Sequence, residues 1–192
     1  MLKINQILVG THNSGKFKEI SNLLPRKIKK ISPTALKIAS PRETGKTFLQ
    51  NSILKAKYFY KKSKIVSISD DSGLEIASMN KRPGIKSARF AKKNGGFKRA
   101  MQKILKILKN KKNRKATFVC SLSIKVNNKK TISALGKVNG TISYKILGKK
   151  GFGYDPIFIP KNKTLTFGQM SPKKKFRIDH RFIAFKKLKK KL

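Results

Sequence analysis

The segment that most constrains the fold is LVGTHNSGKFKEI, at residues 8–20 near the start of the chain. Residues 3–9 are mostly apolar and predict a strand, and apolar side chains recur at helical spacing between Lys16 and Pro25. A polar loop at residues 10–16 joins these two elements. A strand, a loop and a helix in this order predict the start of an α/β fold. The loop and the helix N-terminus are expected to attract anions.

The loop has the spacing of a phosphate-binding P-loop, because Gly10 is followed after four residues by Gly15 and Lys16. A P-loop also needs a Ser or Thr hydroxyl after the lysine to hold Mg²⁺, and Phe17 has no oxygen. The loop can still bind phosphates, so any magnesium must be held elsewhere. A polar turn with an accidental Gly-Lys pair is the alternative interpretation. The candidate phosphate-binding residues are Thr11, His12, Asn13, Ser14, Gly15 and Lys16.

Acidic residues are scarce, which makes each one informative. The chain has 7 acidic and 49 basic residues and a net charge of +42. The adjacent pair Asp70 and Asp71 follows an apolar run at 64–69, which predicts a short strand ending in a turn at 70–73. Carboxylates at a strand end suit Mg²⁺ or catalysis, and neighbouring strand residues face opposite sides, so the two aspartates are expected to divide their roles. Glu43 is a further candidate metal ligand, and a capping turn is the alternative interpretation.

A glycine-rich segment, GFGYDP at residues 151–156, carries a second group of candidates. It places an aromatic side chain on either side of Gly153 and an acid at its end. Phe152 or Tyr154 can stack on a base, and Asp155 can accept a hydrogen bond from a ring N–H. A tight turn with core aromatics is an equally consistent interpretation.

The last predicted helix begins at His180 and Arg181, with Lys175 upstream. Arg181 suits bidentate recognition of a phosphate or carbonyl group, and a solvated basic helix start is the alternative. The helix residues expected to face the core are Phe182, Ile183, Phe185 and Leu188.

The remaining pattern completes the fold class. Helices and strands alternate early and a hairpin appears late, so we expect an α/β protein with a mixed sheet, and the length of 192 residues fits one domain. The further predicted elements are helices at 47–62 and 97–108, hairpin strands at 116–126 and 130–138, and a turn-rich segment at 28–45.

The net charge and the single cysteine limit the possible binding partners and the cellular location of the protein. A net charge of +42 attracts nucleic acid, anionic lipid and nucleotides, but a chain rich in Lys, Ile and Asn can also arise from an A/T-rich genome. The aromatic residues mostly occupy apolar-periodic positions, so nucleic-acid binding is possible but not required. No run of 18 apolar residues predicts a membrane span. Cys120 has no second cysteine to pair with, which fits the reducing cytoplasm.

Taken together, the motifs resemble one family. THNSGK, ETGKTF, SDDSGLEI, PGIKSARFA, GFGYDPIF and the His-Arg pair are similar, in order and across nearly the whole chain, to the inosine/xanthosine triphosphate pyrophosphatases. The resemblance implies an elongated, curved mixed sheet flanked by helices, with two lobes around a nucleotide cleft. It also implies a homodimer and Mg²⁺-dependent hydrolysis of non-canonical purine nucleoside triphosphates. ITP, dITP and XTP would yield the monophosphate and pyrophosphate.

The same resemblance implies roles for the candidate residues. Residues 11–16 would hold the triphosphate. Glu43 and Asp71 would bind Mg²⁺, with Asp71 also the proton acceptor and Asp70 its support. The other residues assigned to substrate are Ser72, then Lys55 and Lys175 at the phosphates, and Phe152, Gly153, Tyr154, Asp155, His180 and Arg181 at the base.

The chain departs from the usual family pattern near its C-terminus. Lys173 and Lys174 stand where acids are usual, Asp179 stands where Ser is usual, and Gln50 replaces a common Glu. These departures bear on selectivity and affinity more than on reaction type. A basic nucleic-acid-binding protein on a relic scaffold is the alternative function. A P-loop kinase or GTPase is excluded by Phe17.

Overall fold

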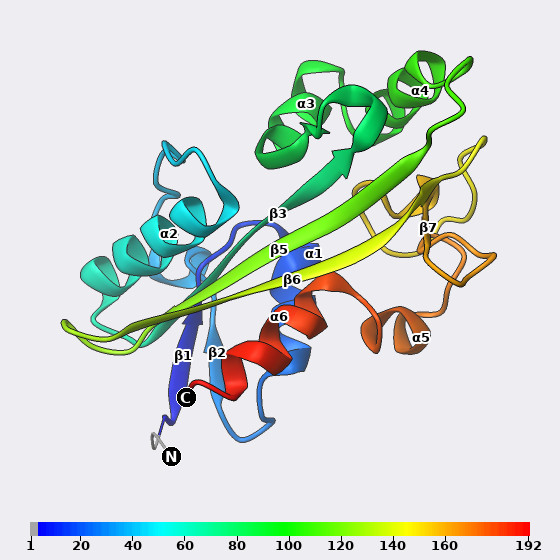
Figure 1. Cartoon of the computed structure of the whole chain (residues 1–192). Coiled ribbons are helices and arrows are strands. Elements are labelled where there is room, and N and C mark those ends of the chain that lie inside the picture. Colours follow the sequence, from blue (N-terminus) through cyan, green and yellow to red (C-terminus); the bar gives the residue numbers. More distant parts are fainter. Residues whose placement is uncertain (1–3) are drawn as a thin grey trace. The chain divides into compact units, whose positions relative to one another are not determined.

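The computed structural model describes residues 4–192 (Figure 1). Within this range the chain divides into two compact units. Unit 1 comprises the chain up to Asp71 together with residues 120–136 and 181–192, and unit 2 comprises residues 72–119 and 137–180. Every helix within residues 4–192 is too short or too polar to cross a lipid bilayer.

The described strands form a seven-stranded sheet in the order β2-β1-β3-β5-β6-β7, with β4 paired to β3. β1 pairs in parallel with β2 and β3, whereas the pairs β3–β4 and β6–β7 are antiparallel. The sheet is therefore mixed, as the sequence predicted. The strands are β1 (Gln6–Val9), β2 (Lys29–Ile31), β3 (Ser67–Ile76), β4 (Arg82–Pro83), β5 (Lys115–Lys125), β6 (Thr131–Ile142) and β7 (Phe158–Pro160).

The helices occupy most of the intervening segments. The α-helices are α1 (Ser14–Leu23), α2 (Phe48–Ser63), α3 (Ser87–Lys93), α4 (Phe97–Ile107), α5 (Pro172–Phe176) and α6 (His180–Lys189). Short 3-10 turns are η1 (Thr34–Leu36), η2 (Ala77–Met79), η3 (Gly84–Lys86) and η4 (Asp155–Ile157). The helices predicted from periodicity, α1, α2, α4 and α6, are all present.

In unit 1, α1 and α6 lie on one face of the strands and α2 on the other, as Figure 1 shows. Leu122 of β5 belongs to an apolar cluster that also contains Ile20 of α1 and Leu188 of α6. Its neighbour Ser121 faces the opposite side, where its Oγ lies 2.8 Å from Oγ of Ser52 on α2. Because strand residues alternate between faces, β5 is covered on both sides and is buried along nearly its whole length.

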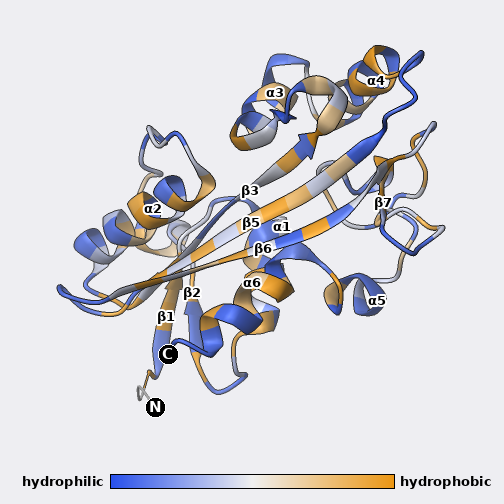
Figure 2. Cartoon of the chain, viewed as in Figure 1, coloured by the Kyte–Doolittle hydropathy of each residue, from blue (hydrophilic) through white to orange (hydrophobic). Residues whose placement is uncertain are grey.

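β6 is instead covered on one side. Burial alternates residue by residue from 134 to 142, and Figure 2 shows hydrophobic and hydrophilic residues alternating along this strand. In unit 2 the ring of Phe118 on β5 packs against Phe158 and Phe167, with centroid distances of 4.6 and 6.0 Å. These rings belong to a core that also takes apolar side chains from α4, including Ile104.

β3 is longer than the sequence predicted. The strand runs from Ser67 to Ile76 through the aspartate pair, so the turn predicted at 70–73 is wrong. The need for glycine at position 73 comes from the space around it and not from a turn. A Cβ atom at Gly73 would lie 2.1 Å from the carbonyl oxygen of Gly84 and 2.6 Å from Oγ of Ser87. The glycine therefore marks a close approach between two backbone segments.

Two further expectations differ from the structure. The segment predicted as turn-rich contains a strand, β2. α6 buries a face rotated from the predicted one, because Arg181 and Ala184 are buried together with Leu188. The side chains predicted to face the core but only partly buried are Phe182, Ile183 and Phe185. This face is set by the ion pairs of Arg181 with Glu19 and Asp70.

Candidate functional site

The predicted phosphate loop lies at the N-terminus of α1. Asn13 caps the helix, its Oδ1 accepting a hydrogen bond from the Lys16 N–H at 2.9 Å, and Oγ1 of Thr11 accepts one from the Asn13 N–H at 3.2 Å. Residues 11–14 line a hollow of about 600 Å³ together with residues from 29 to 36. An accessible, capped helix N-terminus of this kind suits an anion.

Phe17 and His12 make contacts within the protein. The ring of Phe17 packs against the apolar cluster of unit 1, so the residue that replaces the P-loop hydroxyl contributes to the core. Nδ1 of His12 lies 2.6 Å from Oγ of Ser40, which ties the loop to the segment after η1. The loop is thus held in place without a metal-binding hydroxyl.

Asp70 lies at the centre of a charged cluster in unit 1. Its Oδ2 lies 3.2 Å from Nζ of Lys16 and accepts a hydrogen bond from Nε of Arg181 at 3.2 Å. Nη1 of Arg181 in turn lies 2.7 Å from Oε2 of Glu19. Since Asp70 is fully buried, its charge requires such compensation. Asp70 therefore links the phosphate loop to the start of α6.

The hydrogen bond and ion pair described for Asp71 involve other residues of unit 1. Its Oδ2 accepts a hydrogen bond from Nδ2 of Asn51 at 3.0 Å, and its Oδ1 lies 4.0 Å from Nζ of Lys55. The same ammonium lies 2.8 Å from Oε1 of Glu43. Asn51 and Lys55 are four residues apart on α2 and so occupy one face of that helix. The described hydrogen bonds of the two aspartates go to different residues, Arg181 for Asp70 and Asn51 for Asp71, while Lys55 attracts both carboxylates.

Burial and charge set the protonation of this group. Burial raises the pKa of Asp71, although the positive charge of Lys55 acts in the opposite direction. Burial lowers the pKa of Lys55, but the attraction of Asp70, Asp71 and Glu43 outweighs it, so the pKa is raised overall. Lys55 therefore stays charged, and Asp71 accepts a proton more readily than an exposed aspartate.

The residues around Lys55 fit a magnesium ion. Glu43 and Asp71 are oxygen donors of the kind Mg²⁺ prefers, and both already contact one cation, the ammonium of Lys55. Among residues 4–192, no three His, Cys, Asp or Glu side chains are grouped so that they could hold a metal. Two carboxylates are nevertheless enough for Mg²⁺, which usually keeps waters and takes phosphate oxygens as its other ligands.

The glycine-rich segment and Lys175 form a second group, in unit 2. Oδ2 of Asp155 accepts hydrogen bonds from the Phe152 N–H at 2.8 Å and from Nζ of Lys175 at 2.7 Å. The same Nζ lies 5.1 Å from the centroid of the Phe152 ring. Gly151 has a φ of +73°, and a Cβ there would lie 2.1 Å from Asp155 Oδ2, so this turn requires glycine. Lys175 was predicted to contact the substrate phosphates, but its ammonium lies beside Phe152 and Asp155, which were predicted to contact the base.

Two residues predicted to contact the base are part of the unit 2 core. Tyr154 is only 2% exposed, its hydroxyl donates to the Ser87 carbonyl at 2.9 Å, and burial raises its pKa. The ring of His180 is stacked on Phe118, with centroids 4.8 Å apart. Phe152 is partly exposed, so it is better placed than Tyr154 to stack on a ligand.

The structure distributes the predicted residues between the two units and adds two more. Ser72, which follows Asp71 on β3, and Gly153, with a φ of +68°, belong to unit 2. The sequence analysis missed Asn51 and Glu19. The scarcity of acids was a signal for Glu19, and the four-residue spacing to Lys55 was a signal for Asn51. The predicted residues collected in unit 1 are Thr11–Lys16, Glu43, Lys55, Asp70, Asp71 and Arg181.

A mixed α/β sheet with an accessible helix N-terminus, and with lysines and buried carboxylates close to it, is typical of proteins that bind phosphorylated ligands. Comparison with known proteins narrows this class. Residues 7–191 match the sequence model of the Ham1 family, and the chain belongs to this family. The family resemblance and the fold class inferred from the sequence are thereby confirmed.

Similar proteins cover nearly the whole chain. It is 38% identical over 186 residues to a dITP/XTP pyrophosphatase of Caulobacter vibrioides, covering 96% of both chains. It is 38% identical over 195 residues to a dITP/XTP pyrophosphatase of Bacillus subtilis, covering 99% of this chain and 98% of that one. The solved structure of a HAM1 protein from Coxiella burnetii matches with a TM-score of 0.87 at 34% identity, covering 97% of this chain and 98% of that one.

Proposed function

We propose that this protein hydrolyses non-canonical purine nucleoside triphosphates, namely ITP, dITP and XTP, to the monophosphate and pyrophosphate. The observation that carries the proposal is the cluster of unit 1, in which Lys16 and Lys55 lie against Asp70, Asp71 and Glu43 next to the phosphate loop. Its support is the similarity to relatives named dITP/XTP pyrophosphatases over nearly their full length.

The phosphates would bind at the loop of residues 11–16. The N-terminus of α1 and the Lys16 ammonium offer a positive field there, and Lys16 is oriented by Asp70. Lys55, whose Nζ lies 4.0 Å from Oδ1 of Asp71, would supply a second positive charge to the phosphates. Both lysines stabilise negative charge that develops on the phosphate oxygens as the anhydride breaks.

Glu43 and Asp71 would hold Mg²⁺, which when bound neutralises phosphate charge and acidifies water. The magnesium requirement is part of the proposal and rests on these two oxygen donors and their shared cation. Asn51 fixes the orientation of the Asp71 carboxylate through its 3.0 Å hydrogen bond. The amide of Asn51 is itself held, since its Oδ1 accepts from the Gly45 N–H at 2.8 Å.

Asp71 would accept the proton of the attacking water. Its buried carboxylate is oriented by Asn51, as a general base requires. Water attacks the α-phosphorus, the bond to the bridging oxygen breaks, and pyrophosphate leaves. Asp70 stays committed to Lys16 and Arg181 and so supports the site without taking the proton.

The residues proposed to bind the base are those of the unit 2 group, Phe152, Asp155 and Lys175. Phe152 offers a ring face, and Lys175, held by Asp155, offers a donor suited to the 6-keto oxygen of hypoxanthine or xanthine. Adenine carries an amino group at that position and would leave the donor without a partner, which is costly in a dry pocket. Gly153 and Ser72 are proposed as backbone and hydroxyl contacts to the substrate.

Product analysis tests the reaction. The purified protein is incubated with Mg²⁺ and separately with ITP, XTP, dITP, ATP or GTP, and pyrophosphate is measured against orthophosphate. We expect pyrophosphate from ITP, dITP and XTP and little from ATP or GTP. Release of orthophosphate alone, or equal turnover of ATP, would refute the proposed reaction or its base selectivity.

The Asp71→Asn variant tests the proposed base. It should lose turnover of ITP by several orders of magnitude while its circular dichroism and thermal midpoint stay close to those of the unaltered protein. Asp70→Asn serves as a comparison, because it should perturb Lys16 and Arg181 as well and so lower stability along with activity. An Asp71→Asn protein that still turns over ITP would remove Asp71 from the mechanism.

Three broader properties complete the proposal. The whole chain is proposed to act as one catalytic domain, to form a homodimer and to work in the cytoplasm. Cys120 is the single cysteine of the sequence, which supports a reducing location. Light scattering of the purified protein tests the dimer, since a monomer mass at micromolar concentration would contradict it.

A further inference from the structure

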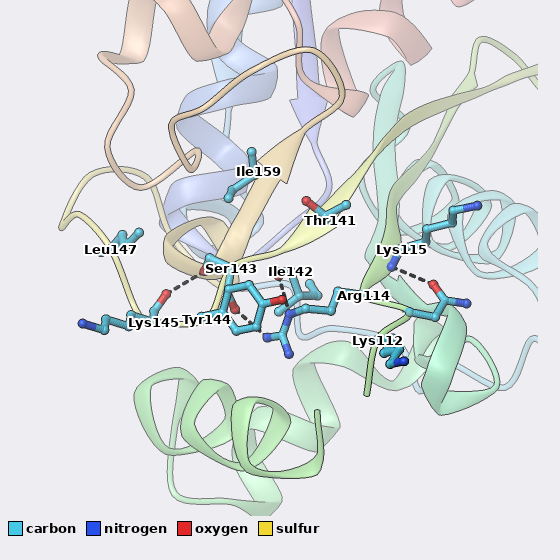
Figure 3. Close-up of a pocket in the computed structure, with 11 residues that line it drawn as sticks. Lys112, Arg114, Lys115, Thr141, Ile142, Ser143, Tyr144, Lys145, Leu147 and Ile159 are labelled. Atoms are coloured by element: carbon cyan, nitrogen blue, oxygen red, sulfur yellow. Dashed lines mark hydrogen bonds between the residues drawn. The ribbon is translucent and has the colours of Figure 1, made fainter. Parts of the chain in front are cut away.

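A second hollow lies in unit 2, among residues that the proposed reaction does not use. It measures about 900 Å³ and is formed by the start of β5, the end of β6, the loop that follows β6, and β7 (Figure 3). Tyr144 projects into it and is 77% exposed, the highest exposure among the large apolar or aromatic side chains described as exposed in residues 4–192. The side chains of Ile142, Leu147 and Ile159 supply apolar surface around the tyrosine.

The guanidinium of Arg114 packs against the ring of Tyr144. The Arg114 side chain is buried, and its three described hydrogen bonds go to the carbonyl oxygens of Leu108, Ile142 and Ser143 at 2.7 to 2.8 Å. Its guanidinium carbon lies 4.3 Å from the centroid of the Tyr144 ring. One face of the ring therefore rests on a fixed, delocalised cation, and most of the residue remains accessible to a planar ligand.

The rim of the hollow is cationic. In Figure 3, Lys112 and Lys115 lie on one side of Tyr144 and Lys145 lies on the other. With Arg114, these side chains bring four positive charges, and no acidic residue is among the described residues that line the hollow. A stackable ring between lysines is the arrangement that binds a base together with its neighbouring phosphates.

We propose that this hollow binds single-stranded nucleic acid, with one base stacked on Tyr144 and adjacent phosphates at Lys112, Lys115 and Lys145. A single mononucleotide is disfavoured because small-molecule sites enclose most of their ligand, whereas Tyr144 is largely open. A second copy of the chain is disfavoured because an isologous contact here would place four cations opposite the same four. The overall charge of +42 supplies long-range attraction for such a strand.

Fluorescence anisotropy with a labelled oligouridine of about 12 nucleotides tests this site. Tyr144→Ala should bind about 5- to 150-fold more weakly, because stacking on one aromatic ring contributes in that range. Tyr144→Phe should bind like the unaltered protein, since it keeps the ring. Hydrolysis of dITP should be the same in all three proteins, which separates this site from the proposed catalytic function. Circular dichroism checks that Tyr144→Ala is folded.

A charge-matched pair of variants separates a built site from the general positive field. Replacing Lys112, Lys115 and Lys145 by Ala should reduce the slope of log K against log salt by about 2, because each phosphate that a lysine neutralises on a single strand contributes about 0.7 to that slope. The control replaces three exposed lysines of α2 and leaves the protein with the same net charge, so its slope should change little. The control lysines are Lys57, Lys61 and Lys62.

Three results would overturn the inference. Equal weakening by the two triple replacements would mean that only the overall charge attracts the strand. Competition by free UMP at the same nucleotide concentration as the strand would mean a mononucleotide site. A light-scattering dimer that Tyr144→Ala dissociates, with strand binding unchanged, would assign the surface to a second copy of the chain.

Discussion

Gly73→Ala should be among the most damaging small changes available in this chain. A Cβ at Gly73 would lie 2.1 Å from the Gly84 carbonyl oxygen, whereas real Cβ contacts essentially never fall below 3.0 Å. The two backbone segments must therefore part by about 0.9 Å. Overpacking typically costs about 1–3 kcal/mol, and a clash with backbone belongs at the upper end because no rotamer change relieves it. For a chain of this length about 3 kcal/mol lowers the thermal midpoint by roughly 6–12 °C.

The same displacement should lower activity more than stability alone explains. Gly73 follows Asp71 by two residues on β3, so moving the strand moves the proposed catalytic carboxylate. A displacement of about 1 Å in a catalytic group can cost on the order of 100-fold in rate. Urea unfolding gives the stability change, and pyrophosphate release from ITP, measured at a temperature where the variant is folded, gives the rate.

Gly84→Ala is the matched control. Its Cβ would meet open space, but the residue has a φ of +55°, so the change carries only the cost of a left-handed backbone, about 1–2 kcal/mol. Gly73→Ala should therefore be clearly more destabilising than Gly84→Ala. If the two variants unfold at the same urea concentration, or if Gly73→Ala keeps full activity, the close approach does not constrain β3 in the way described.

Four further changes have defined outcomes. Arg114→Lys keeps the charge but loses the fork to three carbonyls, and should cost about 2–4 kcal/mol in urea unfolding; a cost below about 0.5 kcal/mol would contradict those hydrogen bonds. Asn51→Leu should lower kcat at least about tenfold with little change in KM, because Asp71 loses its orienting donor; an unchanged kcat would exclude that role. Chelation of divalent metal should abolish pyrophosphate release and added Mg²⁺ should restore it, with Glu43→Gln requiring more Mg²⁺; activity in excess chelator would refute the metal proposal. Tyr154→Phe should cost about 1 kcal/mol at neutral pH through the lost hydrogen bond. Because burial raises the pKa of Tyr154, the unfolded chain loses this proton first, so the advantage of Tyr over Phe should shrink as pH rises above about 10. A constant difference would argue against the buried phenol.

The local elements were predictable because their signals are local. α1 begins at a capping Asn13 and ends before Pro25, and α2 begins at a capping Thr47, all within a few residues of the helix they bound. The same holds for the phosphate loop, whose residues are consecutive in the chain. The motif order was enough to place the chain in its family, because the motifs are short segments with distinctive residue types.

The course of β3 and the buried face of α6 depended on contacts between distant segments. SDDSG has the composition of a turn, yet β3 continues through it, paired with β5 and β4 and with Gly73 close to the backbone at Gly84. Helical spacing in α6 allowed more than one inward face. The face that is buried places Arg181 on Asp70 and Glu19, which are 111 and 162 residues away in sequence.

The sequence by itself determined the helices with strong periodicity, the polar loop before α1, the family and the residue types proposed to carry the chemistry. Only the tertiary structure decided which of those residues meet. It grouped Lys55 with Glu43 and Asp71, and it joined Lys175 to Asp155. The reason is physical: periodicity and capping report interactions within one or two helical turns, whereas a buried charge is stabilised by whichever opposite charge the fold brings within about 4 Å.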